Sequence, residues 1–561
     1  MSTENSSFTS ILAKSDETLS VHTNNAILFL KQMLNWYSPN ISYACNILNI
    51  SRREIIARLF AMVYLHDIGK STPSFQRHVR SNERNSRAFP HALISLPFVI
   101  SSVPALKVNG IEQYLESLAV MSHHTPFYDN LYFQYFEADP KTQYSNNNNT
   151  VSNGLYCKEY ALKFYRYLPE HYKQNFGEEF PFKILSPNFD DKFRILLCRI
   201  KDPVQRQDRP NELHYAHSLF VSILHYCDWL SSGQSHYRFS EELLVPRLDL
   251  YVKHKPSFRN WYDIQKEAGA ITGNLMLSAP TGKGKTEAAL WWANSNLNLG
   301  KILYLLPTRV TVNAMYERLK NILGTTTGIS HGTSVLKIAE DEKWNNSSII
   351  VKRLVFGTFM SPTSVATVDQ LLLSLFNWRH WEMVDQNASN AVIIFDEIHA
   401  YDFYTLALIT KIVRVLSERG SRFAFLSATL PSYLREIITR LLAVKLVSDK
   451  EFQSLVRHNI EFSNQDILDA VDTIITKCKS GKKVLVILNT VDSAVEFYRT
   501  IKERLVSKQF EMSNLLLYHS RFIEKHRIEK ENQIKNAVKS REGFIAITTQ
   551  VVEVSLDIDY D

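Results

Sequence analysis

Histidine and aspartate residues spaced like metal ligands are spread over the first 230 residues of this 561-residue chain. His66 and Asp67 are adjacent in the segment YLHDIGKSTPSFQ, so a carboxylate there can bridge two ions while its neighbour binds one. Imidazole and carboxylate ligands together suit Mn, Fe, Co or Ni better than Mg alone. Two ions about 3.5–4 Å apart activate water and stabilise the leaving oxygen of a phosphodiester. The other candidate ligands are His22, His91, the pair His123 and His124, and Asp228.

None of these histidines is informative by itself. The chain has 18 histidines, and a histidine taken at random is more often a surface or satisfied core residue than a ligand. What favours a two-metal centre is the order of the residue types along the chain. A histidine comes first, then HDxGK, a further histidine, a histidine pair and an aspartate. This set ends before a nucleotide-binding motif begins.

That motif is LMLSAPTGKGKT, which ends an apolar run and precedes the helical pattern EAALWWAN. Gly282, Gly284, Lys285 and Thr286 follow the P-loop pattern, with Ala279 in place of its first glycine. Glycines let backbone N–H groups wrap phosphates, lysine reaches the β and γ phosphates, and a threonine hydroxyl holds Mg²⁺. The alternative is a glycine-rich turn with a solvated lysine. The order strand, loop, helix favours the ATP site.

A pair of carboxylates follows a second apolar run in AVIIFDEIHAYD. A buried strand would deliver Asp396 and Glu397 to its carboxyl end, where open α/β sheets bind ligands. We expect Asp396 to complete the Mg²⁺ site and Glu397 to orient or deprotonate the attacking water. Such a pair alone is often only a helix cap, but the upstream P-loop makes it specific.

The elements that carry these residues change character along the chain. Up to about residue 235, apolar residues recur at helical spacing in AILFLKQMLNWY, EIIARLFAMVYL and HSLFVSILHYCDWL. From about residue 270, short apolar runs (LMLSA, ILYLL, AVIIFD, FAFLS, VLVIL, LLLY and FIAIT) alternate with longer helical patterns, as in parallel α/β sheets. We therefore predict a multidomain protein: an all-α domain over 1–235, a linker over 236–256, and α/β lobes over 257–447 and 448–561.

Bulk composition excludes several classes. Net charge is +7, which permits nucleic-acid binding without establishing it. The five cysteines form no CxxC pair, which argues against a zinc ribbon or a disulfide scaffold and favours a reducing cytoplasm. No signal peptide and no membrane-length apolar stretch is present, so we expect a cytoplasmic protein without membrane partners.

The α/β part resembles a superfamily two helicase, with DEIH as the DExH box and LSATLP as the motif that couples ATP to DNA. In the second lobe VLVILNTVDSA, LLLYHSRF and TQVVEVSLDIDYD match in order, and the last has the form typical of CRISPR-associated helicases. The resemblance implies ATP contacts from Asp557. Gln265 would read adenine, with a solvated surface role as the equal alternative. Contacts or coupling to the DNA strand would come from Pro307, Thr308, Arg309, Thr367, Ser427 and Thr429.

The N-terminal part resembles HD nucleases of the CRISPR-associated type, including the FQ that follows HDxGK. By that resemblance one ion would be held by His22, His66, Asp67 and Asp228. The other would be held by Asp67, His91, His123 and His124. Lys70 would meet the scissile phosphate as a point charge, with a helix C-terminal cap as its alternative.

The two resemblances together imply a type I CRISPR interference nuclease-helicase. Such enzymes are recruited by a guide-RNA surveillance complex (Cascade-like), translocate 3′ to 5′ along single-stranded DNA with ATP and Mg²⁺, and cut it at the two-metal HD site. Two alternatives stay open: an HD phosphohydrolase with a regulatory ATPase, and a non-enzymatic DNA-binding recruitment module. The printed sequence ends at Asp561, before a segment resembling QRxGRxxR, so we expect an incomplete second lobe with weak or no ATPase and no translocation.

Overall fold

The computed structural model describes residues 11–81, 91–108, 110–124, 158–187, 211–232, 244–255, 258–280, 282–297, 301–324, 326–449, 459–507, 514–539 and 542–551. The chain forms two compact units, one of residues 1–307 and 316–449, the other of residues 308–315 and 450–561. Within the described residues no helix is long and apolar enough to span a bilayer.

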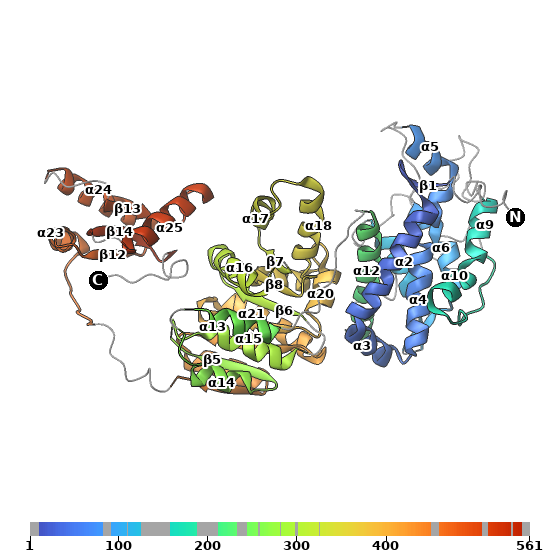
Figure 1. Ribbon diagram of the computed structural model, residues 1–561, viewed down its shortest axis with the longest axis horizontal. Helices are drawn as coiled ribbons and strands as arrows, with labels where there is room; N and C mark the ends of the chain where they lie inside the picture. Colours follow the sequence, from blue (N-terminus) through green and yellow to red (C-terminus); the bar gives the residue numbers. More distant parts are fainter. Residues whose placement is uncertain are drawn as a thin grey trace. The chain divides into compact units, whose positions relative to one another are not determined.

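The N-terminal part of the first unit is helical, as the apolar periodicity predicts. Its helices are α2 (Leu19–Trp36), α3 (Ser38–Leu48), α4 (Arg52–Leu65), α5 (Pro73–Ser81), α6 (His91–Ser102), α7 (Leu115–Ser122), α9 (Lys158–Arg166), α10 (Leu168–Phe176) and α12 (Asn211–Ser232). Figure 1 shows α2, α4 and α12 together in this domain, and α2 packs against both of the others. α4 is buried from Ala57 to Leu65, because nearly every residue of its second half faces another helix.

Side-chain caps mark the starts of α2 and α4, and two small hairpins accompany the helices. Thr18 accepts a hydrogen bond from the Val21 backbone N–H at the start of α2, and Ser51 does the same for Glu54 at α4. The hairpins are β1 (Leu12–Lys14) with β2 (Glu17–Thr18), and β3 (Leu106–Val108) with β4 (Ile111–Gln113). β2 leads directly into α2, so the hairpin lies next to the first candidate ligand.

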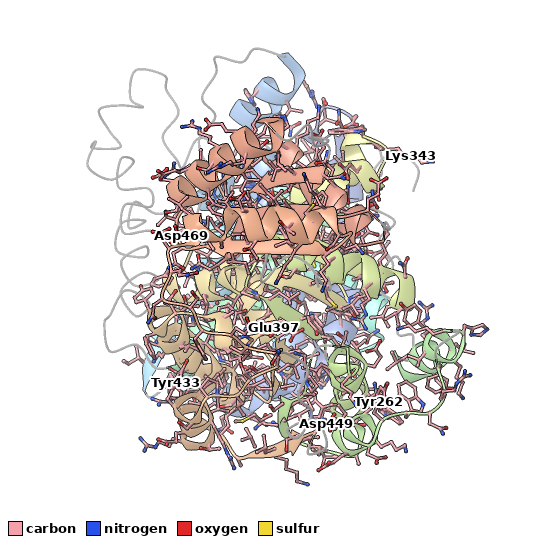
Figure 2. The ribbon with its side chains drawn as sticks, turned by 90° about the vertical axis from the view of Figure 1, so that its left-hand side faces the viewer. Tyr262, Lys343, Glu397, Tyr433, Asp449 and Asp469 are labelled. Carbon is pink, nitrogen blue, oxygen red and sulfur yellow. The ribbon has the colours of Figure 1, made fainter. Side chains whose placement is uncertain are left out.

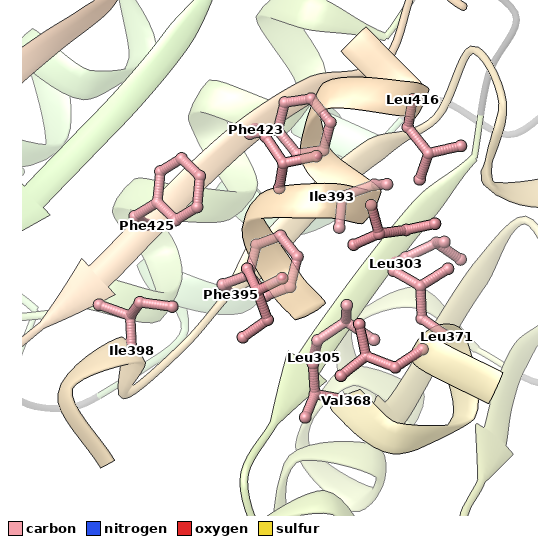
Figure 3. Close-up of a cluster of buried hydrophobic side chains, with 14 of the residues drawn as sticks. Leu303, Leu305, Val368, Leu371, Ile393, Phe395, Ile398, Leu416, Phe423 and Phe425 are labelled. Carbon is pink, nitrogen blue, oxygen red and sulfur yellow. The ribbon is translucent and has the colours of Figure 1, made fainter. Parts of the chain in front are cut away.

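The second part of the first unit is a seven-stranded parallel sheet, in the order β11-β5-β10-β9-β6-β8-β7. The strands are β5 (Asn274–Ser278), β6 (Ile302–Leu306), β7 (Thr327–Ser330), β8 (Thr363–Thr367), β9 (Val392–Phe395), β10 (Arg422–Ser427) and β11 (Val444–Ser448). Figure 3 shows its apolar core, where Phe395, Phe423 and Phe425 stack and Leu303 and Leu305 lie beside them. Because all strands run in parallel, their carboxyl ends share one edge of the sheet.

The helices around this sheet are α13 (Leu244–Lys253), α14 (Asp263–Gly269), α15 (Lys285–Asn296), α16 (Arg309–Leu323), α17 (Ser334–Asp341), α18 (Asn346–Gly357), α19 (Val368–Leu372), α20 (Trp381–Ala388), α21 (Phe403–Glu418) and α22 (Ser432–Leu441). Helix α13 lies inside the stretch 236–256 that we expected to be a linker. It packs against α15, so this part of the stretch belongs to the helicase lobe rather than to a spacer.

A buried amide joins the helical domain to the first helicase lobe. The Asn387 side chain, on α20, donates to the Tyr226 hydroxyl (2.8 Å) and the Thr358 carbonyl oxygen (2.7 Å). Its Oδ1 accepts from the Tyr37 hydroxyl (2.7 Å) and from Lys301. Tyr37 follows α2 and Tyr226 lies on α12, so one side chain ties two helices of one domain to the sheet of the other.

Replacing Asn387 with Ala is expected to destabilise the first unit by about 2–4 kcal/mol, because the buried groups that it satisfies would lose their partners. Differential scanning calorimetry of the full chain measures this as a lower Tm for the corresponding transition. Asn46→Ala, which removes an exposed amide from α3, is the control and should leave the Tm nearly unchanged. Equal Tm values for the two variants would contradict the assignment of Asn387 as the joint.

The second unit contains a smaller parallel sheet, β12-β14-β13. Its elements are α23 (Val471–Lys479), β12 (Lys483–Leu488), α24 (Val491–Ser507), β13 (Leu515–Tyr518), α25 (Glu524–Lys539) and β14 (Phe544–Thr549). Ile545 and Ile547 of the central strand β14 pack against Phe497 and Ile501 of α24. The helical N-terminal part followed by α/β lobes with parallel sheets, as predicted from the sequence, is confirmed.

Candidate functional site

The predicted metal ligands come together from five separate helical segments. His22 lies on the buried face of α2, His66 caps α4 with Asp67 after it, His91 begins α6, His123 caps α7 with His124 after it, and Asp228 lies on α12. Their ligand atoms form two groups, and within each group all lie within 4.8 Å of one another. The first group is His22, His66, Asp67 and Asp228; the second is Asp67, His91, His123 and His124.

Asp67 belongs to both groups, and its two oxygens face different ones. Oδ2 lies 3.3 Å from Nε2 of His22 and 3.4 Å from Nε2 of His66. Oδ1 lies 3.2 Å from Nε2 of His91 and 3.8 Å from Nε2 of His123. This is the arrangement that a carboxylate bridging two ions requires.

The backbone around Asp67 explains the glycine of HDxGK. A Cβ at Gly69 would lie 2.0 Å from the His91 carbonyl oxygen, so only glycine allows α6 to approach this closely. Ser95 of α6 accepts a hydrogen bond from the Gly69 N–H (3.0 Å) and donates to the His66 carbonyl (2.8 Å). The start of α6, which carries His91, is thereby fixed against the segment that carries Asp67.

The charges of the cluster favour a cation. Burial lowers the pKa of His66, but the charges of Asp67 and Asp228 outweigh it and raise that pKa to about 10. Burial would raise the pKa of Asp67, yet His66 and Lys70 hold it well below its ordinary range. Burial would likewise raise the pKa of Asp228, yet its contacts with His22 and His66 hold it well below its ordinary range. Both carboxylates therefore stay ionised, and positive charge is drawn to the space between the imidazoles.

The donor atoms fit metal ions by a second test. Nε2 of His22, His66 and His123 and Oδ1 of Asp67 are buried without an aligned hydrogen bond among the described residues. Such atoms are costly unless something satisfies them. The Nδ1 atoms of His66 and His123 donate to the carbonyl oxygens of Val63 (2.7 Å) and Val120, which directs their Nε2 atoms into the cluster.

Lys70 lies in the 3₁₀ turn Ile68–Ser71, with its Nζ 2.6 Å from Oδ2 of Asp67. It is largely buried and close to the Phe75 ring. A lysine beside the carboxylate that both groups share is suited to meet a phosphate bound there. Lys70 is also the basic residue in the last turn of this 3₁₀ helix, so both its predicted roles stay predictions.

The nucleotide motifs lie at the carboxyl edge of the large sheet. β5 leads into the P-loop, where Gly282 and Gly284 have positive φ angles of 83° and 74°. Lys285 and Thr286 begin α15, so backbone N–H groups and the helix N-terminus face the same space. Lys283 of the loop lies between the Tyr262 ring (5.2 Å) and Asp449 (3.7 Å), both labelled in Figure 2.

Asp396 and Glu397 follow β9, which is two strands away from β5 in the sheet. The Tyr304 hydroxyl donates to Oδ2 of Asp396 (2.7 Å), and Nζ of Lys285 lies 3.3 Å from Oε1 of Glu397. Burial raises the pKa of Asp396, and the charge of Glu397 adds to this effect. Glu397, labelled in Figure 2, has a positive φ of 50°, a strained conformation for a residue other than glycine.

The remaining predicted residues are only partly brought together. Gln265 is buried and donates to the Gly284 carbonyl (3.3 Å), which contradicts the solvated surface alternative. Ser427 and Thr367 are buried, whereas Arg309 and Thr429 are exposed. The Ser427 hydroxyl and Nδ1 of His399 lie 2.9 Å apart, so the DEIH and SAT motifs touch. Pro307 and Thr308 follow β6, and Asp557 lies outside the described residues.

Three family models match the chain. The Cas3 HD domain matches residues 14–237, the DEAD/DEAH box helicase residues 262–437, and the C-terminal part of the CRISPR-associated nuclease/helicase Cas3 residues 480–561. The chain belongs to the Cas3 family.

Individual members of the Cas3 family are distant from this chain. A putative CRISPR-associated nuclease/helicase Cas3 of Methanocaldococcus jannaschii is 28% identical over 553 residues, which cover 89% of this chain and 72% of that protein. Five further Cas3 relatives are matched over only 36% to 41% of their own length.

Solved structures support the Cas3 fold. The crystal structure of T. fusca Cas3 has a TM-score of 0.58 and 18% identity, covering 97% of this chain and 69% of that one. A chain in a CRISPR RNA-guided surveillance complex before nicking has a TM-score of 0.51 and 18% identity, covering 97% and 67%.

Sequence reasoning missed three polar residues at these two sites of the Cas3 chain. Tyr304 binds Asp396, and Arg318 donates to the Thr286 hydroxyl (3.1 Å) and pairs with Glu287 (2.6 Å). Glu17 lies beside His22. No motif singles these residues out. The pairing of β6 with β9 brings Tyr304 close, the turn of β2 into α2 brings Glu17 close, and Arg318 comes from α16.

Proposed function

We propose that this chain is a nuclease of CRISPR interference that cuts single-stranded DNA at a two-metal HD site. The observation that carries the proposal is Asp67, whose two oxygens face two separate groups of buried imidazoles. Each group offers four ligands and is rich in histidine, which suits Mn, Ni, Co or Fe better than Mg. Membership of the Cas3 family and an HD domain ahead of a helicase support the same reaction class.

The chain's own residues would act in defined ways. His22, His66, Asp67 and Asp228 would hold one ion, and Asp67, His91, His123 and His124 the other. Bound ions would supply an activated water and charge stabilisation for the leaving oxygen. Lys70 would bring its ammonium to a non-bridging oxygen of the scissile phosphate. Its position against Asp67 puts that charge at the bridging carboxylate.

The helicase lobes would feed the strand to this site. We propose that ATP and Mg²⁺ bind through Lys285, Thr286 and Asp396, that Glu397 orients the attacking water, and that in a full-length form of the protein hydrolysis drives 3′ to 5′ movement along DNA. A related chain of the same fold is described within a CRISPR RNA-guided surveillance complex before nicking, which supports a complex of that kind as the recruiting partner. Contacts to the strand would be made by backbone charge and stacking, without base specificity.

The test is cleavage of circular single-stranded DNA by the purified chain after chelation and metal return. Removal of metal with EDTA should abolish cutting, and Mn²⁺ or Ni²⁺ should restore it with or without ATP, because the HD ligands are separate from the P-loop. Circular DNA ensures that an internal bond is cut. Preferential hydrolysis of free nucleotides would support an HD phosphohydrolase instead. Metal-independent, salt-sensitive DNA binding without cutting would support a recruitment module.

A further inference from the structure

Among the described contacts of the candidate metal ligands, one carboxylate lies behind an imidazole rather than between the ligands. Oε2 of Glu17 is 3.3 Å from Nδ1 of His22, while Nε2 of the same ring is 3.2 Å from Oδ1 of Asp228 and 3.3 Å from Oδ2 of Asp67. The Glu17 contact has the length of an ion pair, although it is not aligned as a hydrogen bond.

The Glu17 carboxylate is held from several directions. Its Oε1 accepts from the Asn25 amide (3.3 Å), and its Oε2 lies 3.4 Å from Nζ of Lys14. Lys14 also donates to the carbonyl oxygen of Ser232 (3.1 Å), the last residue of α12, which carries Asp228. Glu17 is only 10% exposed, so its charge acts at short range with little screening by water.

The hairpin that carries Glu17 is itself anchored to the metal-site segment. Gln76 accepts from the Leu12 N–H (3.0 Å) through Oε1, and its Nε2 donates to the carbonyl oxygens of Leu12 (2.8 Å) and Lys70 (2.9 Å). In effect the glutamine side chain pairs with β1 like a neighbouring strand. Gln76 is the glutamine of the FQ pair, and this contact gives that pair a structural role.

Glu17 differs from the groups that orient two of the other imidazoles. His66 and His123 point Nδ1 at neutral backbone carbonyl oxygens, of Val63 and Val120. His22 has a carboxylate in the corresponding place. A carboxylate behind a ligating histidine fixes its tautomer and ring orientation and raises its basicity, and losing it typically costs about 10–100-fold in metal affinity.

We propose that Glu17 is a positioning residue for His22. It holds the imidazole with its proton on Nδ1, so that Nε2 is free to bind the ion of the group His22, His66, Asp67 and Asp228. The β1–β2 hairpin, anchored by Gln76 and Lys14, is the frame that keeps Glu17 there. This inference rests on the proposed two-metal site and extends it to a residue that contacts neither substrate nor metal.

The experiment compares Glu17→Gln with wild type and with Glu178→Gln in the full chain. Glu178 is an exposed glutamate in the same domain whose partner is Arg53, so this control makes the same carboxylate-to-amide change away from the cluster. Isothermal titration with Mn²⁺ gives the affinity for each ion. ¹⁵N NMR of histidine-labelled protein loaded with Zn²⁺, with His22→Gln to identify the resonance, reports whether His22 carries its proton on Nδ1.

We expect Glu17→Gln to weaken one of two Mn²⁺ sites by about 10–100-fold, to leave the other unchanged, and to alter the His22 Nδ1 signal. Glu178→Gln should match wild type in all three. Two unchanged Mn²⁺ affinities with an unchanged His22 signal would overturn the role of Glu17 while leaving the two-metal site intact. Equal weakening of both ions with a lowered Tm would mean that Glu17 is merely structural. A wild-type chain that binds no Mn²⁺ would instead overturn the proposed function itself.

Discussion

Replacing Asp67 with Asn is expected to reduce metal-dependent cleavage of circular single-stranded DNA by about 10³-fold or more. Asparagine keeps the shape of the side chain but is neutral, so neither group of imidazoles would retain a bridging charge. Metal ions contribute several kcal/mol of transition-state stabilisation, and each 1.36 kcal/mol is tenfold in rate. The effect is large because Asp67 is shared by both groups of ligands.

The measurement is the initial rate of loss of circular DNA at saturating Mn²⁺, with Glu178→Gln as the carboxylate-to-amide control. The control should cut at the wild-type rate. ATP binding by Asp67→Asn should equal that of wild type, since Asp67 lies in the helical domain and the P-loop follows β5. Cleavage retained by Asp67→Asn would contradict the HD site as the nuclease.

The sequence identifies the candidate ligands better than it does their arrangement. His22 and Asp228 are 206 positions apart, and nothing in their spacing shows that α2 packs against α12. The ordered set of residue types, read together with the resemblance to HD nucleases, nevertheless assigned the same two groups that the geometry forms. The burial of these side chains, and the fact that the two oxygens of Asp67 face different groups of imidazoles, become visible only in the three-dimensional structure.

Strands are predictable where an apolar run is long enough to be buried on both faces. ILYLL and AVIIFD correspond to β6 and β9, which are fully buried. β7 and β8 have the sequences TGIS and TSVAT, which are equally buried but too short in apolar residues to stand out. Their strand conformation comes from pairing of β8 with β6 and of β7 with β8, a long-range effect that propensity does not contain.

The joint between the two domains of the first unit is likewise absent from the sequence signal. Asn387 lies in WEMVDQNA, which reads as an ordinary polar helix face. In the fold all of α20 after Trp381 is buried, and Asp385 pairs with Arg419 (2.5 Å) while Ser218 of α12 donates to it (3.0 Å). From the sequence alone, a polar residue that another domain buries looks the same as a polar residue exposed to solvent. Only the contact between the domains in the structure distinguishes the two.

Replacing Lys285 with Ala is expected to weaken ATP binding by about 10–100-fold. A hydrogen bond to a charged group contributes roughly 1.5–3 kcal/mol, and about 1.4 kcal/mol is a tenfold change in affinity. Lys285 is the first residue of α15, and its Nζ lies 3.3 Å from Oε1 of Glu397. Its ammonium group therefore lies in the nucleotide site, beside the carboxylate that follows β9. Isothermal titration with ATP and Mg²⁺ measures the loss.

Lys266→Ala is the matched control, because Lys266 is an exposed lysine of nearby α14 that pairs only with exposed Asp263 among its described contacts. It should bind ATP like wild type. Lys285→Ala should still cut circular single-stranded DNA with Mn²⁺, as the HD ligands lie on other helices. The two variants should therefore lose different activities: Asp67→Asn loses DNA cleavage and keeps ATP binding, whereas Lys285→Ala loses ATP binding and keeps DNA cleavage. Loss of cutting in Lys285→Ala, with the protein folded, would mean that the nuclease depends on the nucleotide site, and would contradict their independence.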